Sequence, residues 1–240
     1  FEASEEGTPQ GGPLSPLLSN IMLNELDKEL ERRGLPFVRY ADDSMIFCKS
    51  KRAAMRVKES ITRFIENVLY LKVNKEKTVV SYVRGVKYLG YSFYVMKGEC
   101  QLTVHPKSKA KMKSKLKELT SRSNGWGYAN RKQKLKIYIR GWVGYYRLAN
   151  MKRLLLETDE WLRRRIRMCI WKAWKKAKTK VANLIRCGIN KYQAYEWGNT
   201  RKGYWRIADS PILKRAIDNN KLRSAGYATL MEAYLEWYPK

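Results

Sequence analysis

The stretch Tyr40-Ala41-Asp42-Asp43 lies between two short apolar runs, Phe37-Val38 before it and Met45-Ile46-Phe47 after it. β-Branched and aromatic residues favour extended strands, while Asp-Asp-Ser is typical of turns, so the sequence predicts a β-hairpin with two carboxylates at its tip. Adjacent carboxylates repel each other unless a cation binds between them, and Mg²⁺ prefers oxygen ligands of this kind. The alternative is a solvated turn without a ligand, which is the commoner meaning of an isolated Asp-Asp pair.

Further motifs flank this hairpin on both sides. Upstream lies Thr8-Pro9-Gln10-Gly11-Gly12-Pro13-Leu14-Ser15-Pro16-Leu17-Leu18, and downstream lie Asn74-Lys75-Glu76-Lys77-Thr78 and Tyr88-Leu89-Gly90-Tyr91. In this order and spacing, the segments resemble the palm motifs of reverse transcriptases, most closely those encoded by group II introns. The long basic C-terminal region resembles the thumb, or maturase domain, of the same family. The resemblance covers nearly the whole chain and is most specific up to about residue 91.

The resemblance implies an RNA-directed DNA polymerase that joins nucleotides by a two-metal mechanism and also binds intron RNA to assist splicing and retrohoming. Asp42 and Asp43 would be the catalytic residues and would hold two Mg²⁺ ions. The implied partners are group II intron RNA, an RNA template with a DNA primer, and deoxynucleoside triphosphates.

In the resembled family a third carboxylate comes from an earlier palm strand. Glu2, Glu5 and Glu6 are too close to the Gln-Gly motif to supply that strand. We therefore expect the chain to be the C-terminal part of a longer enzyme, to be incomplete as a polymerase by itself, and to need an N-terminal fingers and palm segment as a partner.

Other site residues are carried over from the family motifs. Those implied to bind the nucleotide are Gln10, Gly11, Tyr40, Ala41 and Lys77. Those implied to form the primer grip are Tyr88, Leu89, Gly90 and Tyr91. Without the motif order, Lys77 would be equally well explained as a surface lysine in a turn, and the primer-grip segment as a core strand.

Positive charge is concentrated in the second part of the chain. Residues 1–102 contain 16 Lys or Arg and 13 Asp or Glu, whereas residues 103–240 contain 34 and 9. All eight Trp also lie after residue 125. Cations neutralise phosphates and flat rings stack on bases, so this composition favours nucleic-acid binding. The alternatives are a basic surface over an aromatic core, and an anionic membrane surface, for which no lipidation signal is present.

The periodicity predicts an α+β protein, in which an antiparallel sheet packed on helices precedes a basic all-α region. The resemblance identifies the first part as a partial polymerase palm and the second as the thumb. We expect helices from Ser15 to Gly34, from Ser50 to Val68 and from Pro106, and a further helix whose N-cap is Thr158. Expected strands are 71–74, 79–83, 88–95 and 101–104. The predicted domains are a palm at 1–102, a thumb and maturase domain at 103–200, and a C-terminal helical cap at 201–240.

The helix expected after Thr158 has two faces. Its apolar face contains Trp161, Leu162, Ile166 and Ile170, and its other face is basic. Together with lysines of the helix that starts at Pro106, the basic face is the predicted nucleic-acid surface: Lys107, Lys111, Lys115, Arg163, Arg164, Arg167, Trp171, Lys175 and Lys178. The alternative is an ordinary solvated face with one tryptophan.

Several classes of site are disfavoured. The four cysteines form no C-x-x-C pair and His105 is the only histidine, which argues against a zinc site, a disulfide framework and an appended Cys/His endonuclease. No apolar run reaches membrane-spanning length, so we expect a cytoplasmic bacterial protein associated with nucleic acid. Two functions stay open: the polymerase, and a non-catalytic RNA-binding maturase fragment that acts in splicing.

Overall fold

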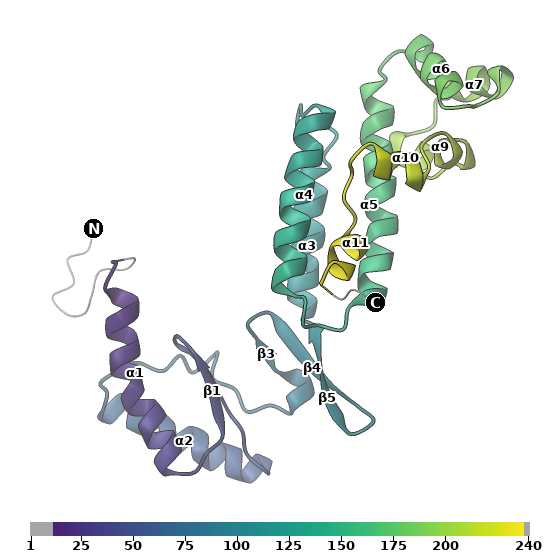
Figure 1. Cartoon of the computed structure of the whole chain (residues 1–240). Coiled ribbons are helices and arrows are strands. Elements are labelled where there is room, and N and C mark those ends of the chain that lie inside the picture. The colour runs from purple at the N-terminus through teal and green to yellow at the C-terminus, as the bar shows by residue number, and fades with distance from the viewer. Residues whose placement is uncertain (1–11, 238–240) are drawn as a thin grey trace. The chain divides into compact units, whose positions relative to one another are not determined.

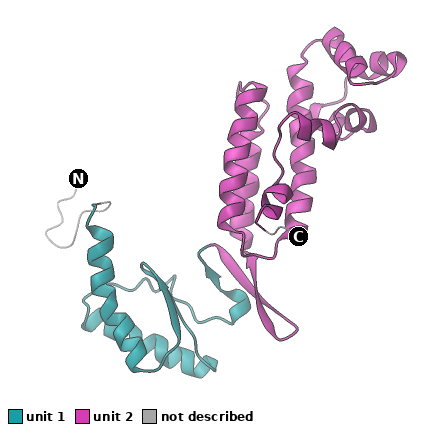
Figure 2. Ribbon diagram, viewed as in Figure 1, with its two compact units in different colours: residues 1–89 teal, residues 90–240 magenta. Residues whose placement is uncertain are grey.

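The computed structural model describes residues 12–237 of the chain. Two compact units make up the fold, and the boundary between them falls between Leu89 and Gly90 (Figure 2). Both units contain helices, and the paired strands β1–β2 and β4–β5 are antiparallel, so the predicted α+β class is confirmed.

The first unit contains two long helices and a hairpin. Its elements are α1 (Ser15–Arg32), β1 (Phe37–Tyr40), β2 (Asp43–Ile46), α2 (Lys51–Asn67), the 3₁₀ helix η1 (Val83–Gly85) and β3 (Lys87–Tyr88) (Figure 1).

Local sequence signals account for the ends of these helices. Ser50 is the N-cap of α2 and its hydroxyl accepts a hydrogen bond from the Ala53 amide, as predicted. At the end of α1, Gly34 adopts a φ of 63°, and the Leu35 amide donates to the Leu30 carbonyl at 3.0 Å. The start of α1 is shifted by one residue, since Ser15 is already helical and Leu14 precedes it as the cap.

A small apolar core joins the hairpin to the helices. Leu26 and Leu30 of α1 are buried with Ile61 of α2, and the paired strand residues Phe37 and Ile46 pack against this cluster. Alternate residues of β1 point toward the core, because successive side chains in a strand face opposite sides. The hairpin is therefore held at its base by apolar packing.

The strands predicted at 71–74 and 79–83 are absent from the structure, so that prediction was wrong. Residues 74–78 do form the expected turn, in which the Thr78 amide donates to the Asn74 carbonyl at 2.9 Å. An extended segment becomes a strand only when a neighbour satisfies its backbone groups, and within residues 12–237 these two segments pair with no other strand.

The second unit combines a hairpin with a helical domain. Its elements are β4 (Tyr91–Met96), β5 (Glu99–Val104), α3 (Pro106–Leu119), α4 (Tyr128–Tyr145), α5 (Lys152–Ala173), α6 (Ala177–Arg186), α7 (Lys191–Gly198), α8 (Tyr204–Ile207), α9 (Pro211–Ala216), α10 (Asn219–Ser224) and α11 (Leu230–Leu235).

The main apolar core of this unit is built from residues of α3 to α11. Leu116 of α3, Ile139 of α4 and Leu162 of α5 are buried in it, together with Leu213 of α9 and Leu230 of α11. Figure 1 shows α11 beside α4 and α5, and α11 contacts both of these helices. The C-terminal segment, which we expected as a separate cap, thus contributes to the core of the same unit.

The β4–β5 hairpin also belongs to the second unit, although we predicted the domain boundary after residue 102. The Tyr91 ring lies 5.2 Å from the Tyr146 ring between centroids, and the Asn150 amide donates to the Leu102 carbonyl at 2.8 Å. These contacts with the end of α4 and the residues after it attach the hairpin to the helical unit.

Helix α5 begins earlier than predicted. It starts at Lys152, so Thr158 is inside the helix and its hydroxyl donates to the Leu154 carbonyl at 2.7 Å. The neighbouring Asp159 is 1% exposed and accepts hydrogen bonds from the amides of Leu230 and Met231, at 2.8 and 2.9 Å. The predicted N-cap at Thr158 was therefore wrong, and the Asp159 carboxylate instead caps amides at the N-terminus of α11.

None of the helices within residues 12–237 combines the length and the apolar character that crossing a bilayer requires.

Candidate functional site

The hairpin of the first unit presents two acidic side chains at its tip. Tyr40 pairs with Asp43, so Ala41 and Asp42 form a two-residue loop. Ala41 has a φ of 53°, in the left-handed region that tight two-residue hairpin loops use. Asp42 and Asp43 are both exposed. The predicted hairpin with adjacent carboxylates at its tip is thus present in the structure.

Arg39 connects this tip to α1 through hydrogen bonds. Its Nε lies 2.8 Å from Asp27 Oδ1, and its Nη1 donates to Asn20 Oδ1 at 3.1 Å and to the Ala41 carbonyl at 3.0 Å. The side chains of Arg39 and Asp27 are only 13% and 21% exposed. Hydrogen bonding to Asp27 raises the pKa of Arg39 above its ordinary value, so the guanidinium stays charged.

Sequence reasoning missed both Arg39 and Asp27. A signal was present, because an arginine that directly follows the apolar run Phe37-Val38 in a strand needs a carboxylate partner when it is partly buried. The contact with Ala41 means that the pair fixes the backbone of the turn that carries Asp42 and Asp43.

Tyr88 lies within electrostatic range of the acidic tip. Its hydroxyl oxygen is buried and has no hydrogen-bond partner among residues 12–237. Burial raises the pKa of Tyr88, the negative charge of Asp43 raises it further, and Arg39 opposes the shift. The structure therefore places one predicted primer-grip residue in the surroundings of the carboxylates.

The other primer-grip residues are divided between the units. Leu89 ends the first unit, while Gly90 and Tyr91 begin the second. Gly90 has a φ of 83°, its carbonyl accepts from the His105 amide at 3.0 Å, and a Cβ atom there would collide with the Tyr146 hydroxyl. Internal packing within the second unit is thus sufficient to require glycine here.

The predicted nucleotide-binding residues are only partly described. Gln10 and Gly11 lie outside the described residues, whereas Tyr40 is 65% exposed beside the acidic turn. Lys77 is exposed in the 74–78 turn, where its amide donates to Asn74 Oδ1 at 3.1 Å. Within the described part of the chain, no hydrogen bond or ion pair joins its amine to Asp42 or Asp43.

The acidic tip offers a partial set of metal ligands. Carboxylate oxygens are the donor type that Mg²⁺ takes, and both aspartates are accessible. Among residues 12–237, however, no three His, Cys, Asp or Glu side chains are grouped closely enough to hold a metal ion. The two aspartates suit a hard cation whose remaining ligands come from elsewhere.

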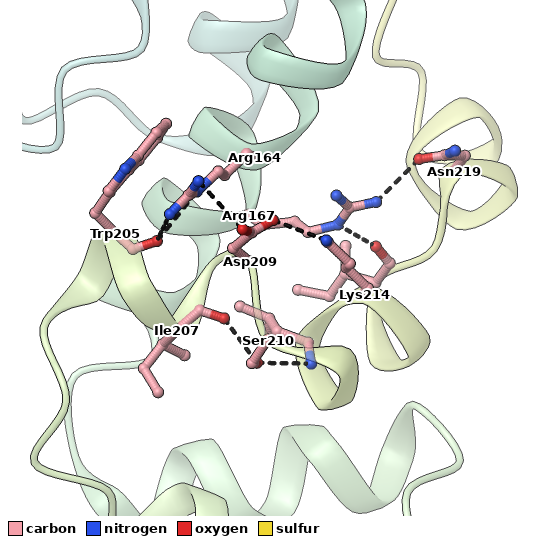
Figure 3. A network of polar contacts seen from close by, with 10 residues as sticks. Arg164, Arg167, Trp205, Ile207, Asp209, Ser210, Lys214 and Asn219 are labelled. Carbon is pink, nitrogen blue, oxygen red and sulfur yellow. Dashed lines mark hydrogen bonds and ion pairs between the residues drawn. The ribbon is translucent and has the colours of Figure 1, made fainter.

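The basic face predicted on α5 requires two corrections. Arg167 is only 6% exposed; its Nε donates to the Ile217 carbonyl at 2.7 Å and its Nη2 to Asn219 Oδ1 at 2.9 Å (Figure 3). Trp171 is 2% exposed and belongs to the core. Burial lowers the pKa of Arg167 from its ordinary value. Neither side chain is placed to contact nucleic acid, because helices that follow α5 in the chain cover this side of it.

Arg164 is also committed to intramolecular contacts. It donates to the Trp205 carbonyl at 3.0 Å, lies 3.9 Å from the centroid of the Trp205 ring, and pairs with Asp209 at 3.2 Å (Figure 3). Asp209 in turn pairs with Lys214 at 2.8 Å, and that hydrogen bond lowers its pKa. Arg164 is half-buried and joins α5 to the segment around α8.

The remaining predicted cations are accessible. Arg163 is half-buried, Lys175 and Lys178 are exposed after α5, and three lysines of α3 are exposed: Lys107, Lys111 and Lys115. Lys115 is bonded to Glu118 at 2.8 Å, so its charge is partly neutralised. The exposed basic surface of the second unit is therefore spread over several elements.

Comparison with known proteins identifies both parts of the chain. Residues 1–93 match the family model described as reverse transcriptase (RNA-dependent DNA polymerase), and residues 109–188 match the group II intron, maturase-specific domain. The chain belongs to the group II intron reverse transcriptases/maturases. Along the chain, the first match ends inside β4, and the second runs from α3 to the residues just after α6.

Three curated relatives align with parts of this chain. Protein YkfC of Escherichia coli (strain K12) is 32% identical over 126 residues, covering 38% of this chain and 33% of that protein. Group II intron-encoded protein LtrA of Lactococcus lactis subsp. cremoris is 28% identical over 160 residues, covering 40% and 27%. Retron Ec86 reverse transcriptase of Escherichia coli is 32% identical over 77 residues, covering 30% and 24%. The chain spans a third or less of the length of these relatives.

Proposed function

We propose that this chain carries part of the active site of an RNA-directed DNA polymerase of the group II intron type, and that it also binds intron RNA to assist splicing and retrohoming. The observation that carries the proposal is the exposed Asp42–Asp43 pair at a hairpin tip, inside the segment that matches reverse transcriptases. A protein that only binds RNA has no physical need for two adjacent exposed carboxylates, because they repel phosphates.

Asp42 and Asp43 would hold Mg²⁺, which supplies positive charge at the reacting phosphates. Arg39 and Asp27 would keep the turn in one geometry. Tyr40 and Ala41 would border the incoming nucleotide, together with Gln10 and Gly11, and Lys77 would approach the triphosphate. Tyr88, Leu89, Gly90 and Tyr91 would support the primer end.

The domain roles belong to the same proposal. Residues 1–102 would be the palm, residues 103–200 the thumb and maturase domain, and residues 201–240 its C-terminal part. The concentrated positive charge of the second unit would hold RNA template with DNA primer, or folded intron RNA, through phosphate contacts.

A second candidate is an RNA-binding maturase without chemistry of its own. It is favoured by one observation, which is that the acidic tip has two carboxylates and no third acidic, His or Cys partner within residues 12–237. Group II polymerisation would then require a carboxylate from a separate segment.

Primer extension on a poly-riboadenylate template with an oligodeoxythymidylate primer distinguishes the polymerase from the RNA-binding maturase. We expect little extension by this chain alone and Mg²⁺-dependent extension when an N-terminal fingers and palm segment is supplied. Extension that stays absent with that segment, together with intact binding of intron RNA, would reject the polymerase and leave the maturase.

A further inference from the structure

Helices α6 and α7 form a compact pair beyond α5 (Figure 1). Gly188, with a φ of 88°, ends α6, and Asn190 caps α7 by accepting from the Tyr192 amide at 2.7 Å. Gly198 faces Val181 so closely that a Cβ atom there would collide with the valine side chain. The two helices therefore pack through a fixed contact, and the turn between them is short.

This contact decides which side of α7 faces solvent. Ala194 is fully buried and Gly198 is buried against α6, and these positions are one turn apart. Tyr192 and Tyr195 lie outside this contact, also one turn apart, and are 80% and 53% exposed. In contrast, Tyr227 and Tyr234 of the same unit are each 6% exposed. The exposure of the two rings follows from helix packing.

The α6–α7 pair carries several exposed cations. Lys191 lies one turn before Tyr195 on the same face of α7, and Lys178 and Arg186 are exposed on α6. Within residues 12–237 none of these three cations forms an ion pair with a carboxylate. Glu196 is the acidic residue of α7, so positive charge predominates on the pair.

We propose that Tyr192 and Tyr195, together with the exposed Lys178, Arg186 and Lys191 of the same helix pair, form a binding surface for unpaired nucleotides of an RNA. The two rings would stack on bases, while the cations would contact the adjoining phosphates. The inference rests on the proposed RNA binding of the second unit. It specifies where on that unit the RNA would bind and that the bound nucleotides would be unpaired. Tyr192 and Tyr195 lie beyond residue 188, where the maturase-domain match ends.

The geometry favours unpaired over paired nucleotides. In a duplex the faces of the bases are already stacked and the edges lie in grooves, so a ring on a convex helix surface cannot reach a base face. Bases in loops and single strands present their faces to aromatic side chains, and this stacking tolerates any sequence. A membrane-binding helix would instead need a broad apolar face exposed to the lipid. The small apolar residues of α7 are buried against α6, so they do not provide such a face.

The test measures binding of the whole chain to three fluorescent RNAs: an oligouridylate, a hairpin with an extended single-stranded tail, and a blunt duplex. For Tyr192→Ala/Tyr195→Ala we expect Kd to rise by roughly tenfold or more for the two RNAs with unpaired nucleotides and to change little for the duplex. The slope of log Kd against log salt should stay constant, because no cation is removed.

Two variants serve as controls. Tyr192→Phe/Tyr195→Phe keeps both rings and should bind like wild type, which separates stacking from hydrogen bonding by the hydroxyls. Tyr70→Ala/Tyr82→Ala removes two tyrosines of the first unit that are 86% and 81% exposed, and it should leave Kd unchanged. Circular dichroism melting of each variant checks that the fold is retained.

A spectroscopic measurement complements affinity. With 2-aminopurine in the unpaired tail, wild type and the Phe variant should quench its fluorescence on binding, and the Ala variant should not. Lys178→Gln and Lys191→Gln should each reduce the salt slope by about 1 without abolishing quenching.

Several results would overturn the inference. These are unchanged tail binding by the Ala variant, an equal loss for the blunt duplex, failure of the Phe variant, or sedimentation with phosphatidylserine vesicles that depends on the same tyrosines. If wild type binds none of the three RNAs, the proposed RNA-binding function fails as well, so the two failures are distinguishable.

Discussion

At the scale of single residues, the acidic tip depends on neighbours that carry no chemistry themselves. Asp42 lies in the two-residue loop and Asp43 begins β2, directly after it. The Ala41 carbonyl of this loop accepts a hydrogen bond from Arg39, whose charge is neutralised by Asp27. A turn with a positive φ at a residue other than glycine stores strain, so surrounding contacts must hold it. The Arg39–Asp27 pair supplies such contacts on the side of α1.

Asp42→Asn should reduce primer extension by at least about 100-fold in the presence of an N-terminal palm segment, because the amide loses the charge that binds Mg²⁺. RNA affinity should be nearly unchanged, since it arises from the distributed cations. Glu76→Gln, in the exposed 74–78 turn, is the control and should extend normally. Near-normal extension by Asp42→Asn would refute the catalytic assignment.

Arg39→Gln should destabilise the hairpin by roughly 1–3 kcal/mol, because it removes hydrogen bonds to a carboxylate and leaves Asp27 partly buried without a partner. Hydrogen exchange of the amides in residues 37–46 measures the free energy of opening. Arg63→Gln breaks an exposed pair with Glu59 and should change stability by less than about 0.5 kcal/mol. Equal effects of the two changes would contradict the role of Arg39.

Tyr227→Phe should stabilise the second unit by about 1 kcal/mol, because the Tyr227 hydroxyl is buried without a hydrogen-bond partner in the described part of the chain. Tyr234→Phe should destabilise it by about as much, since the Tyr234 hydroxyl donates to the Ala149 carbonyl at 3.2 Å. Urea unfolding at neutral pH measures the free energy of unfolding of the two variants and of wild type. A similar loss of stability in both variants would show that the Tyr227 hydroxyl is satisfied in solution.

The Tyr227 variant also has a test at high pH. Burial raises the pKa of Tyr227 to about 12, so the unfolded chain, with an ordinary pKa of 10.0, loses this proton first. Wild type should therefore lose stability as the pH rises above 10 relative to Tyr227→Phe, which has no such proton.

At the scale of elements, α5 is the central member of the second unit. Its residues contact α3, α8 and α11, so more than one side of the helix is covered. This explains why Arg167 and Trp171, which a single helical period assigns to a solvent face, are buried. It also explains why a carboxylate in the middle of α5 can serve the first turn of α11.

Asp159 predicts an unusual pH dependence for this element. Burial raises its pKa above the ordinary 3.8, although the Leu230 and Met231 amides oppose the shift. Between 3.8 and the raised value the folded protein binds a proton that the unfolded chain has lost, so stability falls as the pH rises through that window. Above the raised pKa this contribution is constant.

Comparison with Asp159→Asn isolates that contribution, because all other titrating groups are shared. The unfolding free energy of wild type relative to the variant should increase as the pH is lowered from neutral toward 4, as measured by urea unfolding followed by circular dichroism. A flat difference, or one that decreases on acidification, would contradict the assigned direction.

At the scale of the whole molecule, charge is distributed unevenly. Residues 103–240 carry 34 of the 50 Lys and Arg residues and 9 of the 22 Asp and Glu residues. Some of these cations are used internally, as Arg164 and Arg167 are, but lysines of α3 and the residues after α5 are exposed. A surface of this kind attracts polyanions over distances comparable to the Debye length.

Affinity of the chain for structured RNA should therefore fall steeply with salt. We expect a slope of log Kd against log salt of about 3 or more, because each phosphate contact releases counterions. Lys107→Gln and Lys111→Gln should each lower the slope by about 1, whereas Lys28→Gln, in the first unit, should not alter it. A salt-insensitive Kd would exclude the proposed phosphate contacts.

The sequence by itself determined the local features of this protein. The apolar runs around Tyr40-Ala41-Asp42-Asp43 specify the hairpin, and Ser50 and Gly34 mark helix ends. These features can be predicted because each depends on residues that are neighbours in the sequence. The order of the family motifs can likewise be read directly from the sequence. Only the tertiary structure decided which distant residues contact these local features. Asp159 accepts hydrogen bonds from amides about seventy residues away, and Arg39 pairs with Asp27. In the part of the chain from 12 to 237, the segments around 71–83 have no neighbouring strand. Helical periodicity distinguishes one face from another, but burial of that face depends on which distant segments cover it, and long-range packing sets this.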